Sequence, residues 1–215
     1  MKTALAGSAL IISLCMPTLL PAAELVVRDV HFAVEMLPTD FDYELASNVY
    51  SGSGSDAFEQ HIGIAMGVQY SFSGTGDVSG FILGGEVAAA QADYGSIGNL
   101  TSFGLRLQGG YAWAITDSWL VRGCVEATYG QSTFDVTANT VFPAASLDGT
   151  LFGYGARVGL QYSFNDLLHI GLDVGWLDIE HDLSGDGVDL TLTNSGLVIG
   201  LGISYRLSNS PRPLE

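Results

Sequence analysis

Several charged side chains of this sequence lie in line with small residues that recur at every second position, and this placement limits the chemistry they can do. Four of the six arginines and several acids share it, namely Arg106, Arg122, Arg157, Arg206, Glu35, Glu59, Glu86, Glu126 and Asp173. Buried charges persist only when they are paired and hydrogen-bonded. We therefore predict an internal ion-pair network that consists of Arg106, Arg122, Arg157, Arg206, Glu86, Glu126, Asp173 and His169. The alternative interpretation is a solvated face of ordinary charges.

The histidines are the first candidates for catalytic residues. A serine hydrolase needs Ser and His within hydrogen-bond reach, with an acid that orients the imidazole. A hydrolase acting on lipid would present these groups on its lipid-facing side. His31, His61 and His169 fall instead on the small-residue face, and His181 lies near a loop. We therefore predict no catalytic residues.

Two groups of residues could be taken for metal sites. His61 with Glu59 and Glu35 could gather at one end of two strands, although a hydrogen-bonded interior histidine explains His61 better. Asp182 to Gly187 is similar to the start of a calcium loop, but Thr193 stands where the bidentate glutamate belongs. We expect an acidic surface loop there, no metal site and no cofactor.

Strands must position these side chains, because the sequence alternates with a period of two. In LFGYGARVGLQYSF, residues 151–164, bulky residues alternate with small and polar ones. Eight stretches have this pattern: 24–37, 58–72, 78–93, 101–116, 118–134, 151–164, 167–182 and 190–207. Short connections (73–77, 117 and 165–166) alternate with longer ones (38–57, 94–100, 135–148 and 183–189). The sequence therefore predicts an all-β fold, an eight-stranded antiparallel up-and-down transmembrane barrel.

The chemistry of the two faces distinguishes this barrel from a soluble β-sandwich. The outer face of a soluble sheet carries Lys, Glu, Thr and Arg, whereas the face opposite the bulky residues here is largely Gly, Ala, Ser and Gln. Small residues suit the interior of a narrow barrel, so the bulky ones face lipid. Aromatic residues beside the short turns predict a membrane-interface ring of Tyr70, Phe72, Trp113, Trp119, Tyr162, Phe164 and Tyr205. A second ring is predicted from Phe103, Tyr129, Phe152, Tyr154 and Trp176.

Composition and the N-terminus agree with an exported protein. Residues 1–23 combine Lys2, a short apolar run and Pro21-Ala22-Ala23, which predicts a signal peptide cleaved after Ala23 or Ala22; a membrane anchor helix is the alternative. Cys124 alone then remains, so no internal disulfide can form. The net charge of −16 excludes electrostatic binding of nucleic acid.

With these features the chain resembles the OmpA/OmpX-type small outer-membrane barrels of Gram-negative bacteria, over residues 24–207. The signal peptide, the strand count, the three short turns and the closing strand GLVIGLGISYRL carry the resemblance. It implies a location in the outer membrane, contact with its lipid and lipopolysaccharide, and insertion by the barrel-assembly machinery. In this family the last strand commonly ends in an aromatic pattern with a final phenylalanine; Tyr205 matches it, but Leu207 stands at the last position. A short tail, residues 208–215, follows.

Three functions remain open at this stage. We expect a barrel without catalytic activity, with a structural or surface-interaction role through its loops and an unidentified extracellular ligand. A narrow porin-like channel for small solutes or ions is the alternative, because many interior positions are glycine. Modification of lipid A is a third and weaker hypothesis.

Overall fold

The computed structural model describes residues 25–47, 51–72, 79–137, 145–165 and 167–207. Side chains are described from residue 29 onward, except that of Phe72. The predicted signal peptide and the tail after Leu207 lie outside the described residues. Within the described residues, no helix has the length and apolar character needed to cross a membrane.

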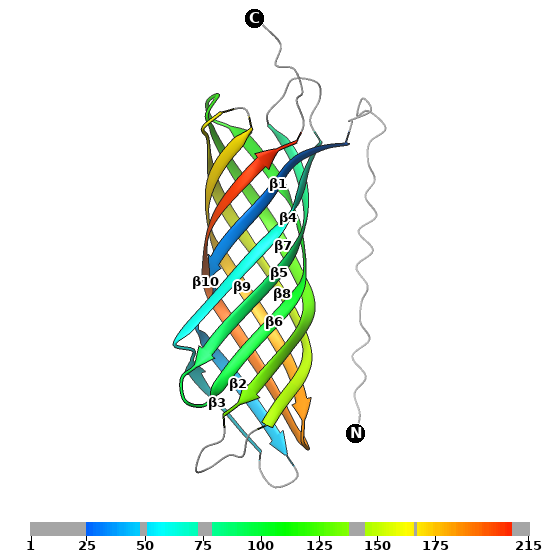
Figure 1. Ribbon diagram of the computed structural model, residues 1–215, viewed down its shortest axis with the longest axis vertical. Helices are drawn as coiled ribbons and strands as arrows, with labels where there is room; N and C mark the ends of the chain where they lie inside the picture. Colours follow the sequence, from blue (N-terminus) through cyan, green and yellow to red (C-terminus); the bar gives the residue numbers. More distant parts are fainter. Residues whose placement is uncertain (1–24, 48–50, 73–78, 138–144, 166, 208–215) are drawn as a thin grey trace, which may run out of the picture.

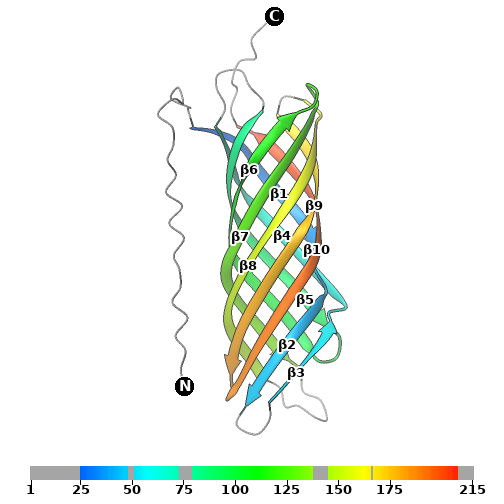
Figure 2. The same cartoon turned by 180° about the vertical axis from the view of Figure 1, so that it is seen from behind.

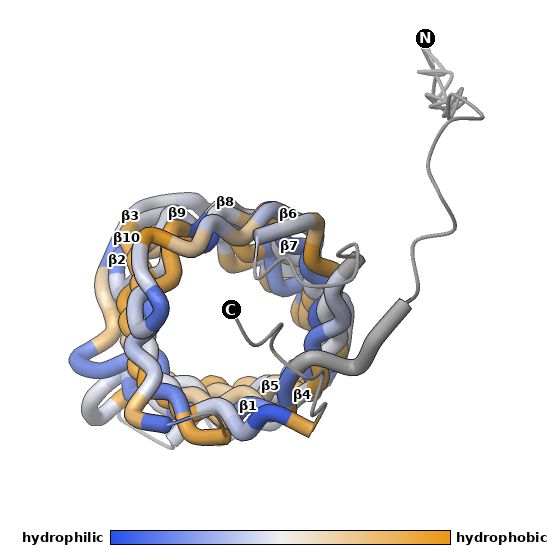
Figure 3. Tube along the Cα trace, turned by 90° about the horizontal axis from the view of Figure 1, so that it is seen from above, coloured by the Kyte–Doolittle hydropathy of each residue, from blue (hydrophilic) through white to orange (hydrophobic). Residues whose placement is uncertain are grey.

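Ten antiparallel strands form one sheet (Figures 1 and 2). They are β1 (Leu25–Met36), β2 (Asp40–Ser47), β3 (Ser51–Ala57), β4 (Gln60–Phe72), β5 (Gly80–Tyr94), β6 (Gly98–Ala114), β7 (Trp119–Val136), β8 (Ala145–Ser163), β9 (Leu168–Gly185) and β10 (Val188–Arg206). The order is β1-β4-β5-β6-β7-β8-β9-β10-β2-β3, and β1 also pairs with β10. That pairing closes a ring of eight strands, which confirms the predicted eight-stranded barrel (Figure 3).

The two additional strands form a hairpin at one end of the ring. β1 pairs with β10 from Asp29↔Arg206 to Met36↔Ile199, and β2 then pairs with the same strand from Phe41↔Asn194 to Ser47↔Val188. β2 therefore continues β1 along β10 after a short break, and β3 returns alongside β2. This end of the molecule is the lower one in Figure 1.

The prediction of long loops at this end is wrong. Residues 38–57 contain β2 and β3, and residues 94–100 contain only a tight turn between Tyr94 and Gly98. In 183–189, Asp186 and Gly187 form the whole connection, and their φ angles of 51° and 76° are the left-handed values that a two-residue hairpin turn requires. In 135–148, β7 continues to Val136 and β8 begins at Ala145, while 138–144 lie outside the described residues.

The prediction of loops is wrong because the two faces exchange their chemistry partway along β5 to β10. On β9 the outward side chains change from Trp176 to Asp178 and Glu180, while the inward ones become Leu177 and Ile179. Trp176 is 58% exposed and Leu177 is 1% exposed, so the alternation itself continues. We call the part with polar outer positions the extension; it comprises the described residues of 40–57, 91–101, 131–151 and 178–195. Read from the sequence alone, outward acidic residues are typical of a loop.

The interior of the extension is an apolar core. It consists of Phe41, Phe58, Ala92, Leu100, Phe134, Leu147, Leu183, Leu190 and Leu192. Phe41 and Phe58 stack at 4.5 Å between ring centroids, and Tyr94 packs edge-on against both rings. A second apolar group lies nearer the middle of the barrel, formed by Leu37, Leu151, Leu177, Ile179 and Val198. These two groups, the apolar layers, place apolar side chains inside the barrel towards the extended end.

The opposite end has short turns that are fixed by their own side chains. The Oγ1 of Thr116 accepts hydrogen bonds from the backbone of Ser118 and Trp119, at 3.3 and 3.1 Å. The Oδ1 of Asn165 accepts in the same way from Leu167 and Leu168, at 2.9 and 2.8 Å. Such side-chain turns favour tight reversals. The predicted short connections at 117 and 165–166 are confirmed; that at 73–77 lies outside the described residues.

Candidate functional site: a charged layer inside the barrel

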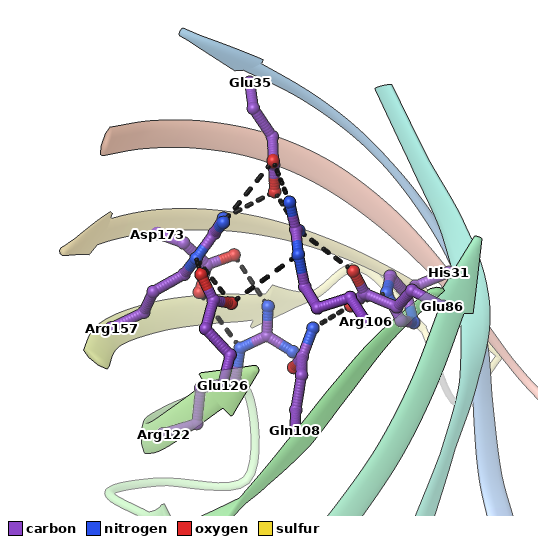
Figure 4. Close-up of polar contacts among 9 residues, drawn as sticks. All are labelled: His31, Glu35, Glu86, Arg106, Gln108, Arg122, Glu126, Arg157 and Asp173. Carbon is purple, nitrogen blue, oxygen red and sulfur yellow. Dashed lines mark hydrogen bonds and ion pairs between the residues drawn. The ribbon is translucent and has the colours of Figure 1, made fainter. Parts of the chain in front are cut away.

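A layer of charged side chains fills the middle of the lumen, between the turn end and the apolar layers (Figure 4). The small-residue face of each strand points inward, and each charged side chain is placed by this alternation. The layer consists of His31, Glu35, Glu86, Arg106, Gln108, Arg122, Glu126, Arg157 and Asp173.

Glu35 on β1 forms the centre of the layer. Both of its oxygens accept hydrogen bonds from the guanidinium of Arg106, at 2.8 Å each. The Nη1 of Arg157 donates to Oε1 of Glu35 at 2.5 Å. β6 and β8 each lie three strands from β1 around the ring, in opposite directions, so these contacts cross the lumen.

Pairs between neighbouring strands extend the layer. Arg106 donates to Glu86 at 3.0 Å, and the Nε of Arg157 lies 2.9 Å from Glu126. The ring of His31 on β1, which is separated from β5 by β4, contacts Glu86 at 2.6 Å, and the amide of Gln108 donates to the same carboxylate. Glu86 therefore has a guanidinium, an imidazole and an amide around it, as a buried carboxylate requires.

A further arginine–carboxylate pair, Arg122 with Asp173, completes the layer towards the turn end. The Nη2 of Arg122 lies 2.6 Å from Oδ2 of Asp173, and its Nε donates to Oδ1 at 3.0 Å. This bidentate geometry is the strong form of an arginine–carboxylate contact. Across the whole layer, three guanidinium groups and the imidazole of His31 face four carboxylates. The opposing charges thus offset much of the cost of their burial.

Three interior glycines, Gly67, Gly159 and Gly175, lie directly beside side chains of this layer. A Cβ on Gly175 would lie 2.7 Å from Cγ of Arg157, and one on Gly67 would lie 2.7 Å from Cγ of Glu86. A Cβ on Gly159 would meet Arg122 and Asp173. The space that each glycine leaves open is therefore filled by a charged side chain of a neighbouring strand.

Sequence reasoning named most of the layer but not all of it. Arg106, Arg122, Arg157, Glu86, Glu126 and Asp173 come together in it. Arg206 lies apart near the turn end, with its Nε 3.8 Å from Asp29, and His169 bonds the hydroxyl of Ser163 at 2.7 Å. Glu35, His31 and Gln108 were omitted from the predicted network. The two-residue alternation of the sequence places all three side chains on the inward face, but their partners depend on ring closure.

The residues considered for metal binding do not converge. Glu35 and His61 line one cavity, whereas Glu59 is exposed. The Nδ1 of His61 contacts the carbonyl of Pro38 at 2.7 Å, and Asp182 accepts from Thr191 at 3.1 Å. No group of three or more metal-ligating side chains occurs within the described ranges.

Two small cavities remain around the charged layer. One, of about 30 Å³, lies between the layer and the apolar residues on its extension side, with Glu35, Arg106, His61 and Leu177 in its lining. The other, of about 20 Å³, lies on the turn side beside Arg122 and Asp173. Cavities of this size have room for only one or two water molecules.

Aromatic side chains surround the apolar outer band. Trp113, Trp119, Phe164 and Tyr205 are exposed near the turn end, Tyr70 and Tyr162 are half-buried, and the side chain of Phe72 is not described. Phe81 and Tyr111 lie in the same zone and were not predicted; their rings are 5.2 Å apart. At the other edge of the band, Phe103, Tyr129, Phe152, Tyr154 and Trp176 are all exposed.

A closed ring with an apolar outer band, aromatic borders and a charged interior defines an outer-membrane β-barrel. The comparisons with known proteins agree. A family model described as outer membrane protein beta-barrel domain matches residues 43–210, most of the chain. The chain belongs to this family.

Several solved outer-membrane proteins are similar to this chain. OprG from Pseudomonas aeruginosa is 15% identical, with a TM-score of 0.54, over 84% of this chain and 96% of that one. Neisserial surface protein A (NspA) is 10% identical with a TM-score of 0.43, over 83% and 97% of the two chains. Ail of Yersinia pestis, the attachment invasion locus protein, is 15% identical with a TM-score of 0.37, over 85% and 100%. No curated protein sequence matches the chain.

Proposed function

We propose that this protein is a closed, non-conducting barrel that acts at the cell surface through its extension. The cross-lumen contacts of Glu35 with Arg106 and Arg157 carry the proposal, because ions would have to break buried, hydrogen-bonded charge pairs to pass. The two apolar layers towards the extended end present a further, dehydrated barrier to ions. Together these features favour the surface role over the porin-like alternative.

The orientation and route of export belong to the same proposal. In barrels of this kind short turns face the periplasm and the longer hairpins face outward, so the extension projects from the cell. Residues 1–23 direct export, and the closing strand β10 is read by the barrel-assembly machinery. The apolar band contacts outer-membrane lipid and lipopolysaccharide. We assign no catalytic activity, including lipid A hydrolysis.

Single-channel recording in planar bilayers tests the closed lumen. Refolded full-length protein should give no steady conductance steps at moderate voltage, under conditions in which a known porin does. Arg157→Ala combined with Glu35→Ala should give more frequent current noise, because the cross-lumen contact is lost. Steady unit steps from the unmodified protein, changed in size by Arg157→Ala alone, would instead establish the channel.

A further inference from the structure

The free edge of the sheet lies in the extension, on β3. β3 is the last strand in the sheet order and, among the described residues, pairs only with β2. Its sequence, SGSGSDA, is exposed or half-buried throughout. Edge strands are usually protected from further pairing by charged side chains, Pro or bulges; β3 has no Pro and no bulge, and its one charged residue is Asp56. Its outer backbone groups can therefore accept another strand.

The surface beside this edge is acidic. Ser53 and Ser55 are the cross-strand partners of Glu44 and Asp42 on β2. The hydroxyl of Ser55 donates to Asp42 at 2.5 Å and orients that carboxylate. The serines are short, so a long side chain on an added strand, about 10 Å from β2, can extend over them to the carboxylates.

The acidic character continues across the neighbouring strands. Thr193 of β10 lies between Asp42 on β2 and Glu180 on β9. Thr191 lies in the same way between Glu44 and Asp182. The sequence of the extension contains no lysine or arginine. A second copy of this chain, or an anionic lipid head group, would thus meet like charge at this edge. An extended segment with basic side chains has the complementary charge.

The edge is also held in position before any partner binds. A Cβ on Gly54 would lie 2.7 Å from the hydroxyl oxygen of Tyr43, so the tyrosine ring packs directly against the strand. Tyr94 donates a hydrogen bond to Asp56. Burial and this hydrogen bond raise the pKa of Tyr94 to about 12, and the same bond lowers the pKa of Asp56. A preformed edge costs little ordering entropy when a strand is added.

We propose that β3 is a docking edge for an extended basic segment of another protein, which adds a strand through backbone hydrogen bonds and places alternate Lys or Arg side chains near Asp42 and Glu44. This mode is β-augmentation with charge selection. It rests on the surface role proposed above and specifies its partner.

A peptide of alternating arginine and threonine, nine residues long, is a suitable probe. Its binding to full-length barrel in phosphatidylcholine nanodiscs would be measured by fluorescence anisotropy, with a glutamate–threonine peptide as control. Ser53→Lys should weaken binding about tenfold, because it puts like charge at the docking edge. Thr150→Lys, an outward position on β8 with the same added charge, should change it less than about twofold. Hydrogen exchange of residues 51–57 should slow when the basic peptide is bound.

Several results would overturn the proposal. Equal weakening by Ser53→Lys and Thr150→Lys would mean diffuse charge attraction only. Binding without slower exchange in 51–57 would exclude strand addition, and concentration-dependent dimers of the free barrel would make a second copy the occupant. If the barrel neither conducts nor binds the peptide, the docking edge is refuted and the proposal of a closed lumen stands. A conducting barrel that binds the peptide would refute the closed lumen alone.

Discussion

Glu35 and Arg157 are separated by 122 residues in the chain, yet their side chains meet inside the barrel at 2.5 Å. One belongs to β1 and the other to β8, so the contact depends on the pairing of β1 with β10 that closes the ring. A buried pair of this kind adds little net stability, but loss of one partner is costly. The pair therefore favours the closed ring over open or misregistered sheets.

A double-mutant cycle tests this pair. Arg157→Met leaves Glu35 and Glu126 with Arg106 as their shared cation, so we expect the free energy of unfolding to fall by about 3–5 kcal/mol. Adding Glu35→Gln should recover part of the loss, with a coupling of about 1–3 kcal/mol. Urea unfolding in lipid vesicles measures both. Strictly additive losses would show that the two side chains do not interact.

Two glycines of β9 provide a test of interior packing. Gly175→Ala should lower the free energy of unfolding by about 1–3 kcal/mol, because the new methyl group meets Arg157 and the backbone of Ala156. Gly171→Ala is the matched control, since its Cβ would have only ordinary contact, at 3.8 Å from the carbonyl of Leu160. Equal tolerance of both changes, measured by urea unfolding, would contradict a filled lumen.

The apolar core of the extension should be a main source of its stability. Leu183 is buried there, and Leu183→Ala should cost about 2–5 kcal/mol. Thr101→Ala, at an exposed position of β6, should change stability by less than about 0.5 kcal/mol. Limited chymotrypsin digestion of vesicle-bound protein would report the loosening. An unchanged digestion pattern for Leu183→Ala would argue against a packed interior.

His181 should make the extension sensitive to acid. It lies beyond the apolar band, between the outward residues Glu180 and Asp182, and its Nδ1 contacts the hydroxyl of Ser132 at 2.8 Å. Burial, with a smaller effect of nearby His61, lowers its pKa from 6.5 to about 3. The unfolded chain therefore binds a proton that the folded chain does not between these pH values, so stability falls as pH drops below about 6.5.

The expected slope is up to about 1.4 kcal/mol per pH unit below pH 6.5. His181→Gln cannot take up the proton, so its stability should fall less between pH 6.5 and 4.5 than that of the unmodified protein. The comparison removes the contribution of carboxylates that titrate in both proteins. If the free energy of unfolding falls equally with pH in the two proteins, His181 does not cause the acid sensitivity.

The faces of the membrane strands were predictable because period-two alternation is local. Phe81 and Ile82 are neighbours, and the pattern alone placed the first outward and the second inward, as the structure has them. Glu35 escaped the predicted network because its partners on β6 and β8 are set by ring closure, which no local pattern contains. β2 was missed although Phe41, Tyr43 and Leu45 alternate with acids, since bulky side chains were expected to face outward everywhere.

The confinement of Arg106, Arg122 and Arg157 to the lumen has a practical consequence for detecting the protein on cells. Lys2 is the only lysine, and the extension has no arginine either, so it contains no site for trypsin whether it is folded or not. Amine-reactive biotin also finds no side chain there to label. Surface surveys that rely on tryptic shaving or amine tagging would therefore overlook this barrel even where it is abundant, whereas carboxyl-directed reagents or chymotrypsin would reveal it.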